Sequence, residues 1–361
     1  MKKHLIYLLI CFFCVSSFEM SAEPVCHFYH FSTKDGLPQY TIMDILQDSK
    51  GLMWFGTWDG LSKFDGYKFY NYKVKPGDNY TMKNNRVEKI YEDKNNRIWF
   101  ISYDGNIHCF SPKTEKFWGL QSLKKFEQLP FQFTKIQITA SGKVWLMSSN
   151  AGCVEVSDSL FNTIYYCKSN GGLNSDVVNS VFEDKYQNSW ILTNDGIKLI
   201  PIDNSKSIGY KFGSNRYSKS SEKAFYSALQ VNNDIWFGSG NGKVRIYSKD
   251  KNQFKLLDLK VTSDVNSFTA TRDNRIVITT SNDGFFVYDL KNNQLKSFNT
   301  ITTNGLSSNK IVSCVVDKAN QLWIETDKIG VSKFDLKTLT GKFFYVKTLI
   351  IRPICFPLVF L

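Results

Sequence analysis

Short apolar runs alternate with polar turns along almost the whole chain, and they follow the two-residue period of strands. The clearest example is segment 48–72, in which the apolar run 52–57 lies between a polar turn and the turn Trp58-Asp59-Gly60. Asp-Gly supplies the positive φ angles that a tight hairpin turn needs. The runs 61–65 and 67–72 follow it. The pattern predicts three consecutive strands joined by turns.

This segment has seven copies. Six of the copies have a tryptophan at the same position: Trp54, Trp99, Trp145, Trp190, Trp236 and Trp323. In the sixth copy along the chain, Val277 stands at this position. Successive copies are 45, 46, 45, 46, 41 and 46 residues apart. A further apolar run precedes each tryptophan run, so one period holds four short strands.

Four antiparallel strands in about 45 residues are typical of a β-propeller blade. We therefore predict an all-β fold, a seven-bladed β-propeller of four-stranded antiparallel blades over residues 27–346. A single blade cannot bury both of its faces, so neighbouring blades must stack on it. The large indole rings are predicted to fill the space between blades rather than to contact a ligand.

A propeller ring must close, and the sequence offers two ways to complete the last blade. Residues 28–31 resemble a lone outermost strand that could pair with the last blade and remove an exposed edge. Alternatively, residues 343–345 fill that position and the first strand pairs elsewhere.

The two ends of the chain differ from the repeats. Residues 1–22 are predicted to be a signal peptide, because a short positive start precedes an apolar stretch of 11 residues, too short to span a bilayer. The chain is therefore expected to be exported. Residues 347–361 form an atypical hydrophobic tail with two prolines. They suggest a truncated or frameshifted reading frame, or else a tail that docks on the propeller.

Cysteine spacing indicates neither a metal site nor a cofactor. The six cysteines outside the predicted signal peptide contain no C-x-x-C pair. Cys153 and Cys167 fall on neighbouring predicted strands, so one disulfide could form in an oxidising compartment. The alternative, which we favour, is that the thiols are small buried apolar groups.

Several repeated pieces resemble the two-component regulator propeller repeat. They are the Gly-Leu pairs at 36–37, 172–173 and 305–306, an Asp at the end of the next strand, Gly-Leu-Met-Trp-Phe-Gly-Thr at 51–57, and Gly-Leu-Ser-Lys-Phe-Asp at 60–65. The resemblance covers about residues 28–345 and implies the exported sensor region of a hybrid two-component system. That family senses glycan fragments in the periplasm and is tethered to the inner membrane. The resemblance implies further sensor and kinase domains as partners, and it leaves open whether the chain forms a homodimer. The kinase His box, receiver Asp and DNA-binding helices are absent from these 361 residues.

Candidate ligand contacts come from the turns between the second and third strands of each blade. These turns lie on the same face of a propeller as the connections between blades. An exposed ring stacks on a sugar and amides match hydroxyls. The candidates are Trp58, Asp59, Tyr103, Asp104, Asn150, Asn194, Asn241 and Asn282. Trp58 and Tyr103 are favoured because they break the small polar character of this position, whereas Asn and Asp suit the turn itself.

The favoured function is a ligand-sensing propeller that binds a glycan fragment and signals to a kinase absent from this chain. The formal charge of +12 weakly favours an acidic oligosaccharide, but the basic residues are scattered, so no nucleic acid is expected. No nucleophile, zinc or phosphate-loop motif is present, so we do not expect an enzyme. One alternative is an exported polysaccharide lyase or glycoside hydrolase with carboxylates drawn from Asp59, Asp104, Asp195 and Asp283. The other is a protein-interaction propeller.

Overall fold

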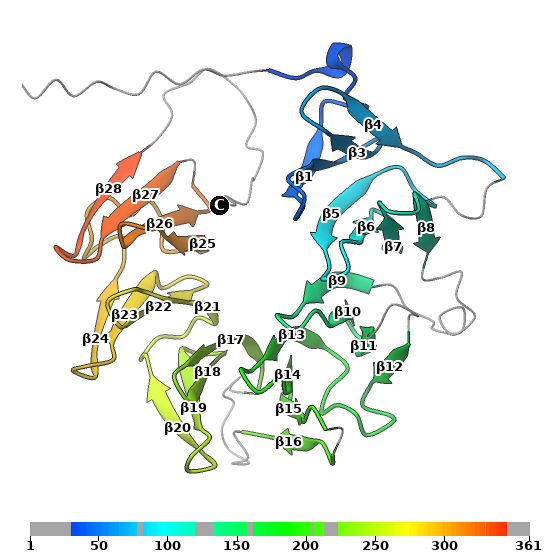
Figure 1. Cartoon of the computed structure of the whole chain (residues 1–361). Coiled ribbons are helices and arrows are strands. Elements are labelled where there is room, and N and C mark those ends of the chain that lie inside the picture. The colour runs from blue at the N-terminus through cyan, green and yellow to red at the C-terminus, as the bar shows by residue number, and fades with distance from the viewer. Residues whose placement is uncertain are drawn as a thin grey trace, which may run out of the picture.

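The chain folds as a ring of seven four-stranded antiparallel sheets, as predicted (Figure 1). A computed structural model describes residues 30–77, 82–119, 133–156, 162–203, 205–212, 223–328 and 330–344. The predicted signal peptide and the hydrophobic tail lie outside these residues. Among the described residues, no helix is long and apolar enough to cross a membrane.

Each sheet is one blade, and its strands follow in chain order from the first to the fourth. A single 3-10 turn, Thr33–Asp35, precedes the first blade. The strands of blades 1 to 4 are β1 (Ile42–Gln47), β2 (Met53–Thr57), β3 (Gly60–Phe64), β4 (Phe69–Tyr72); β5 (Val87–Glu92), β6 (Ile98–Ser102), β7 (Ile107–Ser111), β8 (Lys116–Gly119); β9 (Phe133–Ile138), β10 (Val144–Ser148), β11 (Cys153–Val156), β12 (Thr163–Tyr166); β13 (Val178–Glu183), β14 (Ser189–Thr193), β15 (Gly196–Ile200) and β16 (Ile208–Tyr210). Those of blades 5 to 7 are β17 (Phe225–Val231), β18 (Asp234–Ser239), β19 (Lys243–Ser248), β20 (Gln253–Asp258); β21 (Val265–Ala270), β22 (Arg275–Thr280), β23 (Phe285–Asp289), β24 (Gln294–Phe298); β25 (Ile311–Val316), β26 (Gln321–Thr326), β27 (Val331–Asp335) and β28 (Thr340–Phe344).

Five of the six tryptophans lie buried between blades, which confirms their predicted packing role, whereas Trp323 is half-buried. Trp54 packs with residues of blade 2, and its ring centroid is 5.7 Å from that of Phe110. Trp99, Trp145, Trp190 and Trp236 are likewise buried against the blade that follows their own. Val277 takes the same place between blades 6 and 7. Apolar contact between consecutive blades, rather than local propensity, therefore holds the ring together.

The polar turn before each tryptophan strand has a structural task. The carboxylate of Asp48 accepts hydrogen bonds from the backbone N–H of Lys50 and Leu52 and from the indole of Trp54, at 3.0, 2.9 and 2.8 Å. Asp93, Asp184 and Asp317 accept the indole of their own blades in the same way. Blade 3 has Thr139 in this position, and the buried indole nitrogen of Trp145 has no hydrogen-bond partner. One buried donor in this series is thus unsatisfied.

Glycines in the second turn of the blades link each blade to the next. Gly60, Gly152, Gly196, Gly242 and Gly284 donate their N–H to the connection that opens the following blade, at 2.7–2.9 Å. Gly196 has φ +104°, and an added Cβ would lie 2.1 Å from the carbonyl oxygen of Tyr210. Only glycine fits such a position.

Two open questions from the sequence are answered by the described residues. β28 completes blade 7 by pairing with β27, so the outermost position of this blade is filled by the strand that contains residues 343–344. His30 and Phe31 belong to no strand. Cys153 and Cys167 are free and buried, so the alternative of a disulfide is not observed and the favoured interpretation as buried apolar groups is confirmed for these two thiols. Burial raises the pKa of the Cys153 thiol well above its usual range.

Candidate functional site

The turns between second and third strands lie beside the connections between blades, as expected. Backbone hydrogen bonds show this directly, because Tyr103 donates its N–H to the carbonyl of Arg86 at 2.9 Å and Gly60 donates to that of Asn85 at 2.7 Å. The connection that leads into β5 thus touches the turns of both blade 1 and blade 2. This shared edge is where the two favoured aromatic residues meet.

Trp58 and Tyr103 are joined by an arginine that stacks between them. The guanidinium carbon of Arg86 lies 5.0 Å from the Trp58 ring centroid and 4.1 Å from that of Tyr103. Both rings remain exposed, at 49% for Trp58 and 65% for Tyr103. Cation–π contact with a planar guanidinium orders the two rings without covering their outer surfaces. We name Trp58, Arg86 and Tyr103 the aromatic ladder.

Polar groups flank the aromatic ladder on the blade 1 side. The Asp59 carboxylate pairs with the ammonium of Lys73 and accepts a hydrogen bond from the amide of Asn85 at 3.1 Å. The carbonyl of the same amide accepts the N–H of Val74 at 2.7 Å. The Trp58 indole N–H points to the sulfur of Met43 at 3.0 Å. Asp59 therefore fixes the connection between blades 1 and 2 as well as its own turn.

On the blade 2 side, Asp104 belongs to a short, partly buried hydrogen-bond network. Its carboxylate accepts the hydroxyl of Ser102 at 2.6 Å and the side-chain amide of Asn106 at 2.7 Å. Burial opposes ionisation of Asp104, but these hydrogen bonds outweigh it and lower the carboxyl pKa. The Ser102 hydroxyl also lies 3.4 Å from Nε2 of His108, whose Nδ1 has no partner. Burial lowers the pKa of His108 to about 4, so this ring is neutral at pH 7.

The remaining predicted contacts stand in separate blades. Asn150, Asn194 and Asn282 are exposed in the turns of blades 3, 4 and 6, and Asn241 is half-buried in blade 5 with φ +55°. The Asn194 side-chain carbonyl accepts the amide of Asn179 at 2.9 Å. Each of them therefore lies on a different blade from the aromatic ladder.

The four carboxylates considered for catalysis all have partners within the ring. Beyond Asp59 and Asp104, Asp195 pairs with Lys211 at 3.0 Å and Asp283 accepts the hydroxyl of Ser263 at 2.6 Å. Each joins a turn to the connection nearby. The recurrence of aspartate in these turns is thus explained by its contact with the neighbouring connection. Across the part of the chain that the structure describes, no group of three or more His, Cys, Asp or Glu could hold a metal ion.

The basic residues around the aromatic ladder are neutralised locally. Arg86 pairs with Glu88 at 2.6 Å, and Lys89 lies 3.9 Å from the carboxylate of Asp44. Together with the Lys73–Asp59 pair, these contacts pair three cations of this edge with carboxylates, and the charge of Lys83 acts on His108 nearby.

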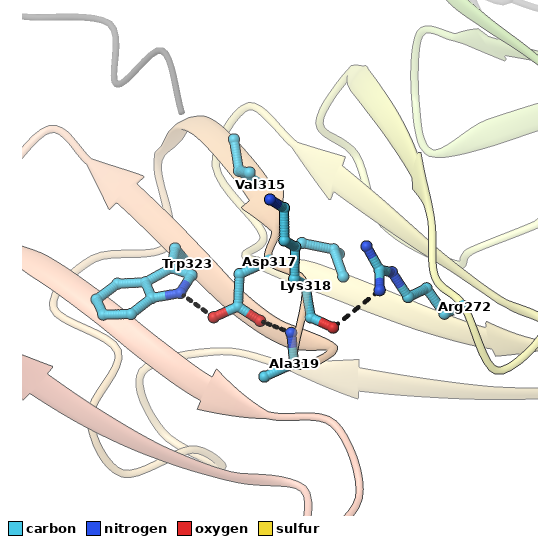
Figure 2. A pocket seen from close by; sticks show the side chains of 7 residues that line it. Arg272, Val315, Asp317, Lys318, Ala319 and Trp323 are labelled. Atoms are coloured by element: carbon cyan, nitrogen blue, oxygen red, sulfur yellow. Dashed lines mark hydrogen bonds between the residues drawn. The ribbon is translucent and has the colours of Figure 1, made fainter. Parts of the chain in front are cut away.

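A cavity of about 480 Å³ lies away from the aromatic ladder, on blade 7 (Figure 2). It is lined by Arg272, Val315, Val316, Asp317, Lys318, Ala319 and Trp323. Asp317 accepts the Trp323 indole N–H at 2.8 Å, and Arg272 donates to the carbonyl of Lys318 at 2.9 Å. None of the eight predicted contact residues lines it.

Arg86 and Asn85 are the site residues that the sequence prediction missed. The predicted contacts came only from the turns between second and third strands, whereas these two residues lie in the connection between blades 1 and 2. An arginine placed directly before a first strand was the available signal, because that position lies beside two turns at once. Its stacking between two rings depends on the packing of two blades, which the sequence pattern alone does not specify.

Comparison with known families finds the same repeat. Residues 36–59 and 81–104 match the two component regulator propeller family, and each match extends to the turn that carries Trp58 or Tyr103. A segment of 51 residues, 14% of the chain, is 49% identical to histidine kinase P4 of Formosa agariphila, of which it covers 4%.

Solved structures share the fold at low sequence identity. The extracellular domain of the hybrid two-component system BT3049 from B. thetaiotaomicron is 20% identical, with a TM-score of 0.55, over 84% of this chain and 41% of that one. The extracellular domain of BT4673 from the same organism is 19% identical, with a TM-score of 0.55, over 81% and 38%. Virginiamycin B lyase from Staphylococcus aureus is 12% identical, with a TM-score of 0.52, over 79% and 92%. These likenesses establish the propeller. This chain spans about two fifths of the two sensor structures.

Proposed function

Because this chain carries the repeats of the two-component regulator propeller family, we propose that it is a periplasmic ligand-sensing propeller of a hybrid two-component sensor. Its ligand would be an oligosaccharide fragment, and its signal would pass to a kinase outside these residues. The observation that carries the proposal is the aromatic ladder, in which two exposed rings are held side by side by Arg86. Exposed, ordered rings with amides beside them suit the apolar faces and hydroxyls of sugars.

The local charges favour a ligand that is bound by stacking. Lys73, Arg86 and Lys89 near the ladder each have a carboxylate partner, so an anionic sugar gains little from these three cations beyond what a neutral sugar gains. Asp59 and Asn85 offer polar atoms beside the Trp58 ring. In this proposal Asn150, Asn194, Asn241 and Asn282 would contact only ligands long enough to extend over further blades.

A panel of neutral and uronic-acid oligosaccharides, measured by calorimetry and thermal shift, tests the proposal. We expect at least one sugar to bind, and Trp58→Ala or Tyr103→Ala to weaken it about tenfold or more, since a stacked aromatic residue contributes roughly 1–3 kcal/mol. Tyr67→Ala is the matched control, because Tyr67 is 95% exposed in the turn after β3. Absence of binding across the panel, or an equal loss in the Tyr67 variant, would contradict the proposal.

A further inference from the structure

An exposed tyrosine lies on the face of the propeller opposite the aromatic ladder, between blades 4 and 5. Tyr186 belongs to the turn 184–188, which joins β13 to β14, and is 41% exposed. The aromatic ladder stands in turns between second and third strands, at the other end of the blades. A strand of five or six residues separates the two ends by roughly 17–20 Å. Figure 1 shows β13–β16 and β17–β20 as neighbours in the ring. Tyr186 therefore lies outside the site described above.

Two lysines lie against the Tyr186 ring. The ammonium nitrogen of Lys249, in the turn after β19, is 3.0 Å from the ring centroid, and that of Lys185 is 5.2 Å from it. Lys185 also donates to the carbonyl of Asn232 at 3.3 Å and to the side-chain carbonyl of Asn233. In the part of the chain that the structure describes, neither ammonium group forms an ion pair. Two positive charges thus meet at one exposed ring.

A cavity of about 60 Å³ lies beside Tyr186. Side chains of both blades line it, among them Leu199, Gln230, Asn233, Ile235 and Lys249. Its volume is about twice the ~30 Å³ that one water molecule takes in the liquid. A carboxylate group fits a space of this size, whereas a pyranose ring does not.

Two other interfaces fill the equivalent place with a glutamate of the ring itself. Between blades 1 and 2, Glu92 accepts the hydroxyl and the backbone N–H of Ser49, each at 2.7 Å. Between blades 3 and 4, Glu183 accepts the same two groups of Ser141, the N–H at 2.9 Å. Strand register places Gln230 at the position of these two glutamates, because each of the three pairs with the residue before the tryptophan of its blade.

Between blades 4 and 5 the charges of this contact differ. Gln230 accepts the backbone N–H of Lys185 at 2.7 Å, so the hydrogen bond remains but the acceptor is neutral. The donor residue is a lysine here and a serine in the other two interfaces, and Lys249 adds a second cation. This interface thus lacks the carboxylate that the ring supplies elsewhere and gains two ammonium groups. Its charge is complementary to a carboxylate from outside the ring.

An exposed apolar side chain extends this surface. Ile202, in the turn after β15, is 48% exposed, and its N–H donates to the side-chain carbonyl of Asn188 at 3.1 Å. This hydrogen bond holds the turn of Ile202 against the turn of Tyr186. Aromatic residues are enriched at protein interfaces, where apolar contact surrounds a few polar anchors. We name Lys185, Tyr186, Ile202 and Lys249 the lysine–tyrosine surface.

We propose that the lysine–tyrosine surface binds an acidic segment of a protein partner, with one glutamate or aspartate carboxylate of that segment in the cavity and in contact with the ammonium groups of Lys185 and Lys249. The rest of the segment packs on Tyr186 and Ile202. A second copy of this chain is disfavoured as the partner, because the formal charge of +12 makes two copies repel. The proposal does not depend on sugar binding at the aromatic ladder, which lies on the other face.

Fluorescence anisotropy with the full chain and a labelled peptide of six glutamates tests the proposal, and a peptide of six glutamines is its uncharged match. The salt concentration is 0.15 M, at which the Debye length is about 8 Å. The test variant is Lys185→Gln with Lys249→Gln. The matched control is Lys63→Gln with Lys68→Gln, since these two ammonium groups lie 4.6 and 4.5 Å from the ring centroid of Tyr70 on blade 1. Tyr70 lines neither of the two cavities described above.

We expect the glutamate peptide to bind and the glutamine peptide to bind at least about tenfold more weakly. The Lys185 and Lys249 variant should lose about tenfold or more in affinity for the glutamate peptide, because charge-assisted hydrogen bonds are lost. The control variant should lose less than about threefold, because distant charges are screened.

Gln230→Glu is a second test, because it gives this interface the carboxylate that Glu92 and Glu183 supply elsewhere. The new carboxylate should pair with Lys185 and weaken peptide binding about fivefold or more. Gln294→Glu adds the same charge at an exposed position of β24 and should change the affinity less than about twofold.

Four outcomes would overturn the proposal. The first is that the glutamate peptide does not bind, and the second is an equal loss in both lysine variants, which would reveal general attraction to a basic chain. The third is trigalacturonate binding as tightly as the peptide and depending on the same lysines, which would assign the surface to acidic sugars. The fourth is unchanged binding to the Gln230→Glu protein. Thermal unfolding of each variant identifies any loss of affinity that comes from misfolding, and the Gln230→Glu variant then decides.

Discussion

His108 makes the stability of this propeller depend on pH in a range where few other side chains titrate. The ring is fully buried in β7 and stacks on Phe100 with centroids 5.0 Å apart. Burial lowers its pKa from 6.5 to about 4, with Asp104 opposing the change and Lys83 adding to it. Between these two pH values the unfolded chain binds a proton that the folded chain does not. The free energy of unfolding therefore falls as pH decreases from 6.5 to 4, by ~3 kcal/mol at 1.36 kcal/mol per pKa unit.

Replacing His108 by phenylalanine should remove this dependence. At pH 7.5 the two proteins should differ by less than ~1 kcal/mol, because the contact to Ser102 is long at 3.4 Å and Nδ1 has no partner to lose. At pH 4.5 the variant should be the more stable by ~2 kcal/mol. His30→Phe is the control, since His30 is exposed and its replacement should leave the pH profile unchanged.

Urea unfolding followed by far-UV circular dichroism at pH 4.5, 5.5, 6.5 and 7.5 measures both profiles. Carboxylates with lowered pKa values, such as Asp258 at about 2, are common to both proteins and cancel in the difference. Parallel profiles for the wild type and His108→Phe would refute the reasoning, because the buried ring would then titrate alike in the folded and unfolded chains.

Three further changes test the structural logic of the repeats and of the ladder. Thr139→Asp should raise the free energy of unfolding by about 1 kcal/mol, because it supplies the acceptor that the Trp145 indole lacks. Asp184→Ala should lower the free energy of unfolding by roughly 2–4 kcal/mol, because it leaves the Trp190 indole and two backbone N–H groups without an acceptor. Urea unfolding measures both variants, and a change in the same direction for both would contradict this reasoning. Gly196→Ala should lower the free energy of unfolding by at least about 2 kcal/mol, because the added Cβ would meet the carbonyl of Tyr210. Gly66→Ala should lower it by about 1 kcal/mol or less, because Gly66 has a positive φ but open space around it. Equal decreases of the two variants in thermal unfolding would show that backbone strain alone sets the loss of stability. Arg86→Lys retains the charge but loses the planar stacking, so it should weaken binding of any sugar found in the panel about fivefold with little change in stability; unchanged affinity in calorimetry would remove Arg86 from the site.

The fold was predictable because its determinants repeat. A tryptophan every 45 residues or so, an aspartate before it and a glycine after it each report one local requirement: an inter-blade spacer, an indole acceptor and a turn with positive φ. Residues that depart from the repeat could be identified from the sequence, but their neighbours in space could not. Trp58 and Tyr103 were found because they break the pattern, but Arg86 was not, because its place between them arises from the packing of two blades. The burial of His108 was missed for the same reason: period-two alternation places the residue on one face of β7 without saying how closely the next blade covers it.

These exceptions cluster for a physical reason. In a propeller the repeated polar residues are already used by the ring: turn carboxylates pair with connections, and turn glycines donate to the next blade. A repeated position therefore has few hydrogen-bonding groups left for a ligand, and recognition must come from residues that the ring does not need. At the edge between blades 1 and 2, such residues coincide in space, because the exposed rings of Trp58 and Tyr103 both contact Arg86. Lys73, Arg86 and Lys89 there are paired with carboxylates, so the net charge of +12 is a poor guide to what binds at this edge. If a ligand binds there, ring stacking should decide its class. Neutral and uronic sugars in the binding panel should therefore bind with similar affinity.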